Sequence, residues 1–204
     1  GLYFQPKGLL VAIRDNPALF IDLLRYRWKD DNGQSIKPDD AQTRVLEKQV
    51  SGLLFALAEL PGQSDLCPMS EKTIAEWVTE VIKLASESRY LTAVGLQLPD
   101  VITNGAWTSI DRWPTAQMAE AINVLADAIP ETFPEHLSNS LSNARGVHWC
   151  DPSGQSEKSQ AESLRKRADE VRKTCPSASK ALRDVAQGLE SEGRSNIERE
   201  NWER

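Results

Sequence analysis

Two residues capable of nucleophilic chemistry and proton transfer lie close together in the irregular segment 143–154. His148 and Cys150 are two positions apart, and a histidine that lowers the pKa of a nearby thiol activates it as a nucleophile. Residues two apart seldom turn both side chains toward one substrate, and the segment has no protease signature. We therefore expect a structural loop, in which Trp149 fills the core and Arg145 and His148 make hydrogen bonds. An enzyme that uses Cys150 and His148 is an alternative.

The histidines and cysteines that could bind a metal are scattered along the chain. A protein metal centre needs three or four ligands that converge on one point. Besides His148 and Cys150, the candidates are Cys67 and His136, which are far away in sequence. The phosphate-binding motifs GxxxxGK[ST] and GxGxxG are absent from the chain. The sequence therefore predicts no metal, no cofactor and no enzymatic activity.

A basic strip lies within the predicted helix 157–175. Its candidates for contact with nucleic acid are Arg165, Lys166, Arg172 and Lys173. Asp169 shares the helical face of Arg165 and Arg172, so the positive charge is interrupted. The stretch 157–201 also lacks aromatic side chains that could stack on bases. A nucleic-acid-contacting accessory domain is a second hypothesis, and a solvated helix surface is favoured over it.

Six tryptophans are many for a chain of 204 residues. Large aromatic side chains anchor both hydrophobic cores and protein interfaces. Trp28 and Trp77 fall on apolar helix faces and are assigned to the core. Trp107 and Trp113 flank a loop, where an exposed aromatic group would mark a site of protein contact. The predicted partner surface consists of Trp107, Trp113, Arg145 and His148.

The overall composition is that of a folded protein. Hydrophobic residues make up 40% of the chain and charged residues 26%, unlike a disordered segment. The formal net charge is −6, and it is uneven: residues 1–154 carry 13 Lys and Arg against 20 Asp and Glu, and residues 155–204 carry 11 against 10. General affinity for nucleic acid depends on many cations that displace counterions from phosphates. This balance of charge makes nucleic acid an unfavoured partner.

Cysteine content and hydropathy indicate the compartment. Three cysteines without a CxxC pair argue for a reducing environment and against a disulfide framework. No apolar run approaches the roughly 20 residues that a membrane span needs, and no signal peptide is recognised. We expect a cytoplasmic location and no association with membranes.

Prolines, glycines and apolar periodicity predict an all-α protein. Stripes at spacings of three and four residues recur throughout, and no segment shows the alternation of a half-buried strand. Short loops favour antiparallel neighbours, so we expect helical hairpins packed as an irregular bundle or short solenoid, with about eight or nine helices. The predicted helices cover about 9–13, 17–28, 39–60, 70–85, 90–98, 114–129, 131–141 and the hairpin 155–203.

Residues 1–5 have the pattern of a protease-cleavable tag remnant, and residues 6–204 are interpreted as a single all-helical domain. Several short motifs within the domain form one pattern. They are Asn143-Ala144-Arg145-Gly146-Val147, Ser153-Gly154-Gln155-Ser156-Glu157 with Ala161, Leu60-Pro61-Gly62, Ile74-Ala75-Glu76-Trp77-Val78, Gly105-Ala106-Trp107 and Ala168-Asp169. Through them, residues 16–202 resemble the C-terminal helical region of large, poorly characterised bacterial multidomain proteins. The resemblance implies an accessory region attached to other domains, in some cases in a defence or regulatory setting, and supplies no catalytic residues.

These observations favour a non-catalytic α-helical interaction or scaffold module of a larger bacterial protein. Its expected partners are other domains of the same protein or a separate protein. The sequence leaves open the identity of the partner and the oligomeric state.

Overall fold

The computed structural model describes residues 7–35, 40–63, 65, 67–69, 73–146 and 151–203, and for residues 199–203 it describes the backbone alone. Within these ranges the chain forms nine α-helices and one short 3-10 helix, and it has no strand. The prediction of an all-α bundle with about eight or nine helices is confirmed. The helices are α1 (Lys7–Asp15), α2 (Pro17–Arg27), α3 (Ala41–Ala56), α4 (Ile74–Ser88), α5 (Leu91–Thr103), η1 (Ala106–Ser109), α6 (Ala116–Ala128), α7 (Phe133–Asn143), α8 (Gln155–Val171) and α9 (Pro176–Glu203).

Side-chain caps fix where several helices begin. The carboxylate of Asp40 accepts a hydrogen bond of 2.7 Å from the backbone N–H of Thr43 at the start of α3. Thr73 and Glu76 form a reciprocal capping box at the start of α4. The hydroxyl of Thr115 caps α6 in the same way. Each cap satisfies backbone donors that have no partner inside the helix.

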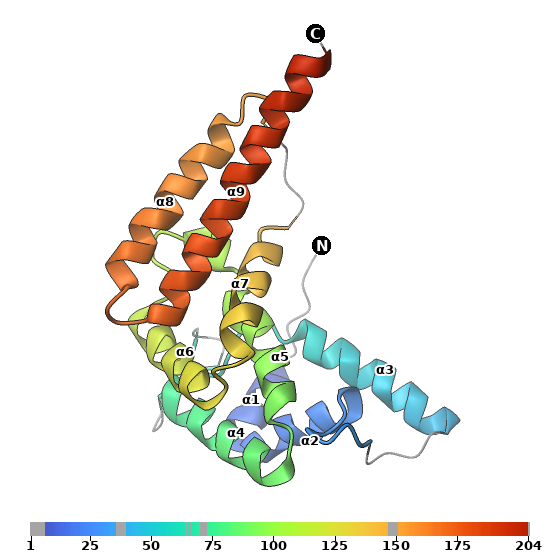
Figure 1. The fold of residues 1–204 in the computed structure, drawn as a ribbon. Coiled ribbons are helices and arrows are strands. Elements are labelled where there is room, and N and C mark those ends of the chain that lie inside the picture. The colour runs from blue at the N-terminus through green and yellow to red at the C-terminus, as the bar shows by residue number, and fades with distance from the viewer. Residues whose placement is uncertain are drawn as a thin grey trace.

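The body of the molecule is built around α4. This helix packs against α2 and α6, and α5 packs against α7 (Figure 1). Phe20 and Trp77 meet in the core with ring centroids 5.8 Å apart, and both are fully buried. The indole N–H of Trp77 donates to the carbonyl of Ile13 over 3.0 Å, so the buried ring leaves no donor unpaired. Trp77 therefore occupies the core position that the sequence predicts.

The last two helices form a long antiparallel hairpin that stands on the body. α8 and α9 run side by side, and α9 also packs on α7 and α6 (Figure 1). Small residues line the seam between the two helices and allow their backbones to approach closely. The buried residues of this seam include Ala161, Ala168, Ala178, Ala181 and Ala186.

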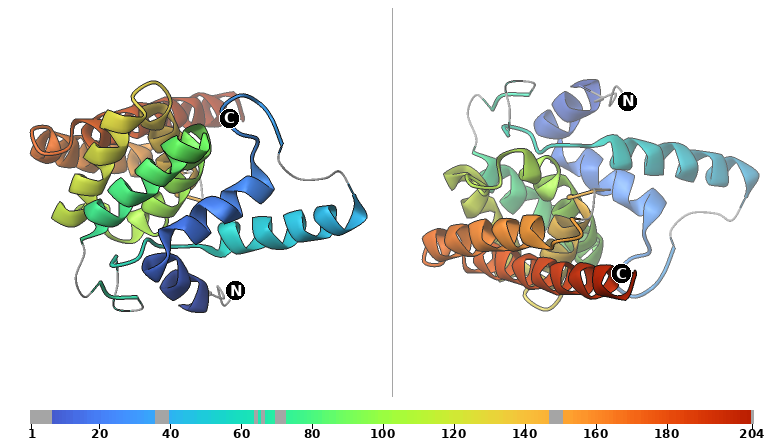
Figure 2. Two further views of the ribbon diagram at one scale, coloured as in Figure 1. Left: turned by 90° about the horizontal axis from the view of Figure 1, so that it is seen from below. Right: turned by 90° about the horizontal axis from the view of Figure 1, so that it is seen from above.

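α3 lies at the edge of the molecule. Its N-terminal end points away from the other helices in both views of Figure 2, and its main helix contact is with α2. The apolar spacing of Leu46, Val50, Leu53, Leu54 and Leu57 predicts that they share one face of this helix, but two of them are not buried. Leu46 and Leu53 are 38% and 39% exposed, because α2 covers only the side of α3 that carries Val50 and Leu54.

α5 continues beyond the point where the sequence predicts its end. Pro99 lies inside this helix, which runs to Thr103. A proline removes one backbone hydrogen bond from a helix, but the turn that follows is held by burial of Val101 and Ile102. The hydroxyl of Thr103 also donates to the carbonyl of Pro99 over 2.9 Å. None of the helices in the described part of the chain is both long and apolar enough to cross a membrane.

Candidate functional site

A buried ionic cluster joins the end of α7 to the hairpin. The guanidinium of Arg145 donates to the carboxylate of Glu192 on α9 over 2.6 Å, and it lies 4.0 Å from the carboxylate of Glu157 on α8. It also lies over the ring of Trp107, 6.0 Å from the centroid. The side chain of Arg145 is 10% exposed and that of Glu157 is 0% exposed. We call Arg145, Glu157 and Glu192 the Arg145 cluster.

Glu157 is the least satisfied member of the cluster. One of its carboxylate oxygens accepts a hydrogen bond of 3.3 Å from the backbone N–H of Asp151, and the other has no hydrogen-bond partner. A buried carboxylate is costly unless it is paired. The nearby guanidinium of Arg145 therefore stabilises Glu157 and ties three segments of the chain together. The cluster is a structural latch that holds the end of α7, α8 and α9 together. The sequence alone does not reveal it, because its members are distant along the chain.

The two tryptophans of the predicted partner surface point into the protein. Trp113 is 7% exposed, and its indole N–H donates to the carbonyl of Ile102 over 3.3 Å. Trp107 is half-buried, and its N–H donates to the carbonyl of Leu141 over 2.8 Å. His148, the fourth residue of that surface, lies outside the described residues. The described members therefore present little apolar area to a partner, and their contacts are internal.

The proposed nucleophile and base lie in a segment that is not described, since residues 147–150 include both His148 and Cys150. The other two cysteines are buried and not disulfide-bonded. Burial raises the pKa of the thiols of Cys67 and Cys175, which disfavours the reactive thiolate. Among the described residues no group of three histidine, cysteine or acidic side chains is placed to hold a metal.

Salt bridges divide the basic strip of α8. Arg165 forms an ion pair with Glu190 across the hairpin, and Asp169 accepts from Arg183 over 2.6 Å. Lys166 on α8 is exposed, as are Arg172 and Lys173 directly after its end, and the acidic residues Asp169 and Glu170 lie close to them along the chain. An ion-paired arginine contributes less to phosphate binding than a free one, because it must give up a partner first. The positive charge on this part of the surface is therefore interrupted by acidic side chains, which disfavours the binding of nucleic acid.

Arg167, within the same strip, has a role that sequence reasoning misses. Its guanidinium donates to three consecutive carbonyls of the loop before α6 and is only 19% exposed. The acceptors are Arg112 at 3.0 Å, Trp113 at 2.9 Å and Pro114 at 2.9 Å. One side chain of α8 therefore holds the loop that positions Trp113.

We expect Arg167→Ala to lower the free energy of unfolding by about 2 kcal/mol, because hydrogen bonds from a charged donor to three carbonyls, two of them partly buried, are lost. Urea denaturation followed by circular dichroism measures the change. The matched control is Arg172→Ala, an exposed arginine on the neighbouring turn, for which we expect a change within about 0.5 kcal/mol. Equal effects of the two substitutions would show that the loop contacts contribute nothing.

Asp151 organises the start of α8. Its carboxylate accepts from the backbone N–H of Ser156 at 3.0 Å and from the N–H and hydroxyl of Ser153 at 2.9 and 2.8 Å. These hydrogen bonds, chiefly the one from the Ser156 N–H, lower the pKa of Asp151. A group whose pKa is lower in the folded state stabilises the fold above its unfolded pKa, and this contribution disappears as the pH falls through the folded pKa.

Acidification is therefore expected to destabilise the parent chain more than an Asp151→Asn variant over the range below the usual aspartate pKa of about 4. Melting temperatures recorded from neutral pH down to about pH 2.5 test this, since that range spans the titration. Asp127→Asn, at an exposed position of α6, is the control. Identical acid profiles for the parent and Asp151→Asn would contradict the predicted linkage.

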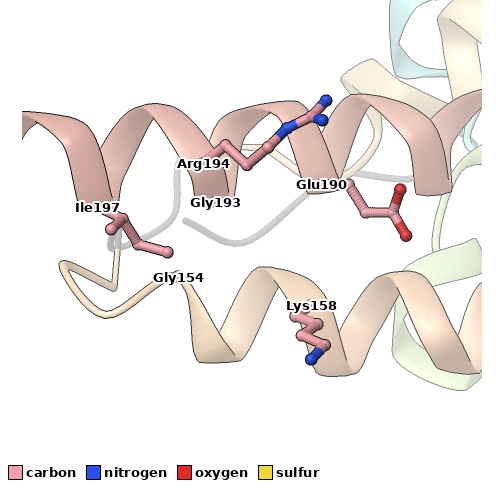
Figure 3. Close-up of a pocket in the computed structure, with 6 residues that line it drawn as sticks. All are labelled: Gly154, Lys158, Glu190, Gly193, Arg194 and Ile197. Atoms are coloured by element: carbon pink, nitrogen blue, oxygen red, sulfur yellow. The ribbon is translucent and has the colours of Figure 1, made fainter.

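A small hollow opens between the two helices of the hairpin (Figure 3). It has a volume of about 240 Å³. Its walls are formed by Gly154, Lys158, Glu190, Gly193, Arg194 and Ile197. In Figure 3 the side chain of Ile197 reaches from α9 toward Gly154, and that of Arg194 extends away from α8. The hollow lies next to a close backbone contact and brings together no acid, base and nucleophile.

A larger hollow, of about 650 Å³, lies at the C-terminal end of α3, between that helix, α5 and α7. Most of its polar lining groups already have partners within the fold. Ser140 donates to Asp100 over 2.6 Å, and the side-chain amide of Asn104 donates to the carbonyl of Ala58 over 2.8 Å. Phe55 lies at this hollow and is 82% exposed. The exposed surface without a partner at this end of α3 is therefore apolar.

Comparisons with family descriptions, with curated proteins and with solved structures find no match to this chain.

Proposed function

We propose that this chain is a non-catalytic α-helical interaction or scaffold module, and that α3 carries its binding surface. The observation behind the proposal is the distribution of exposed apolar side chains. Four of the six large hydrophobic residues exposed in the described part of the chain lie on this one helix, at Val45, Leu46, Leu53 and Phe55. A concentration of exposed apolar residues on one element is typical of a surface that contacts another protein.

The position of α3 supports this proposal. The helix stands at the edge of the molecule, so a partner can reach it without displacing the body (Figure 2). The hollow of about 650 Å³ at its C-terminal end adds a concave, largely apolar floor beside the helix. A projecting amphipathic helix with a hollow at its base suits the docking of a partner helix.

We further propose that the chain works as the C-terminal accessory region of a larger cytoplasmic bacterial protein and contacts either other domains of that protein or a separate partner. The sequence motifs at residues 60–62, 74–78, 105–107 and 143–157 support this placement. The buried Trp113 and the internal contacts of Trp107 and Arg145 favour α3 over the tryptophan surface as the site of contact.

Affinity capture from a lysate of the source organism tests the interaction. The bait is the whole chain, and the comparison bait is a Val45→Glu/Leu53→Glu variant, whose new charges oppose apolar contact. Ile197→Glu provides the control, because Ile197 is exposed on α9, away from α3. We expect a protein retained by the parent and by the control but lost with the α3 variant. Equal capture by all three baits would overturn α3 as the binding surface.

A further inference from the structure

α3 carries an uncharged line of residues along its outer side. Val45, Gln49, Gly52 and Ala56 follow one another at intervals of four, three and four residues, which places them on one line of an α-helix. The first three are exposed and Ala56 is half-buried. A Cβ atom added at Gly52 would meet nothing within 4 Å, so the middle of the line is open. This spacing is that of a seam between two packed helices.

The residues on either side of the seam are also ordered. Leu46 and Leu53 lie on one flank, seven residues or about two helical turns apart. Phe55 lies on the other flank, in line with the cations Arg44 and Lys48. The side opposite the seam carries the buried residues Thr43, Val50 and Leu54, which face the body. The seam and its flanks therefore carry most of the exposed residues of α3.

We propose that the occupant of this face is α3 of a second copy of the chain, packed antiparallel about a two-fold axis. The inference rests on the proposed role of α3 as a binding surface. A two-fold axis midway between Gln49 and Gly52 pairs a residue of one copy with a residue of the other so that their two numbers add up to about 101. Val45 then faces Ala56 of the second copy, and Gln49 faces the open space at Gly52. Every bulky seam residue meets a small one.

The flanks fit the same arrangement. A two-fold axis of this kind brings like flanks together, so Leu46 of one copy meets Leu53 of the other, twice. On the other flank Phe55 comes to the level of residue 46 of the second copy, midway between Arg44 and Lys48. A cation near an aromatic face is attracted to it, and the aliphatic parts of the Arg44 and Lys48 side chains cover the ring of Phe55. The four exposed apolar residues of α3 all gain contacts, and the seam buries no charge.

The size of the face sets the strength of the contact. α3 has 16 residues, and a helix of that length is about 24 Å long and 10–12 Å wide. Its outer half offers roughly 500 Å² per copy, or about 1,000 Å² in total, which is below the roughly 1,200–2,000 Å² of stable interfaces and in the range of weak, transient ones. The arrangement is therefore a reversible dimer with a dissociation constant in the micromolar range, roughly 1–100 µM.

Sedimentation velocity of the whole chain over concentrations from about 1 to 300 µM tests the proposal across that range. The expected result is a monomer–dimer equilibrium that Leu53→Glu and Gly52→Leu each weaken at least tenfold. Both positions are exposed in the monomer, and circular dichroism verifies that the variants fold. Ile197→Glu, an exposed apolar position on α9, is the matched control and leaves the equilibrium unchanged.

A mixing experiment tests the antiparallel register. Leu53→Glu and Leu46→Lys chains each dimerise poorly alone, and their mixture recovers a heterodimer, because the new carboxylate faces the new ammonium. A parallel pair would place position 53 against position 53 and give no recovery. A monomer at all concentrations, or a dimer insensitive to the seam variants, overturns the proposal. A monomeric chain that still captures a partner through α3 would leave the proposed function standing and remove only the second copy as occupant.

Discussion

Arg145→Met is expected to lower the free energy of unfolding by about 3–5 kcal/mol, the cost of removing one partner from a buried ion pair. The substitution keeps most of the side-chain volume and removes the guanidinium. It removes the positive charge 4.0 Å from the fully buried carboxylate of Glu157, which keeps its hydrogen bond from the backbone N–H of Asp151, and it takes from Glu192 a hydrogen bond of 2.6 Å. Urea unfolding followed by circular dichroism measures the loss.

Two comparisons separate burial from charge. Arg183 pairs with Asp169 in an exposed ion pair, so Arg183→Met is expected to cost less than about 1 kcal/mol. The double variant Arg145→Met/Glu157→Leu replaces both charges by apolar groups and is expected to be more stable than Arg145→Met alone. A cost below about 1 kcal/mol for Arg145→Met would show that water satisfies Glu157 and that the cluster is not a latch.

Local signals in the sequence predict most of the helices. The stripe through Ile74, Trp77, Val78 and Val81 is buried in the structure, as periodicity predicts. The alanine-rich stripes after residue 155 form the seam of the α8–α9 hairpin. These predictions succeed because caps, prolines and apolar spacing act within a few residues, where the sequence contains all the relevant information.

Predictions that depend on distant segments are less successful. The apolar residues of α3 cover more of its circumference than one neighbour can bury, and only the position of α2 decides that Leu46 and Leu53 stay exposed. Arg167 looks like one more surface cation, yet it meets carbonyls more than 50 residues away. The members of the Arg145 cluster likewise come from three separate segments, so no local pattern reveals it.

Gly154→Ala is expected to lower the free energy of unfolding by about 2–5 kcal/mol, for two independent reasons. Gly154 has a φ of +64°, a left-handed conformation that L residues with a side chain adopt only at a cost. A Cβ atom at this position would also lie 2.6 Å from the carbonyl oxygen of Gly193 on α9. That oxygen belongs to the backbone of a long helix, so relief requires the two helices of the hairpin to move apart.

Two alanine variants separate these reasons. Gly105 also has a positive φ, of +71°, but a Cβ atom there meets nothing within 4 Å, so Gly105→Ala is expected to cost only about 1–2 kcal/mol. Gly193 is helical, and its Cβ atom would lie 3.2 Å from the carbonyl oxygen of Gly154, so Gly193→Ala tests crowding without strain. Thermal or urea unfolding of the three variants provides the comparison. If Gly154→Ala lowers the free energy of unfolding no more than Gly105→Ala does, the two helices move apart at this end of the hairpin to accommodate the added Cβ atom. A larger loss of free energy of unfolding for Gly154→Ala than for either of the others means that close backbone contact fixes the start of α8 against α9. The first turn of α8 also carries Glu157, so the same contact positions this carboxylate beside Arg145.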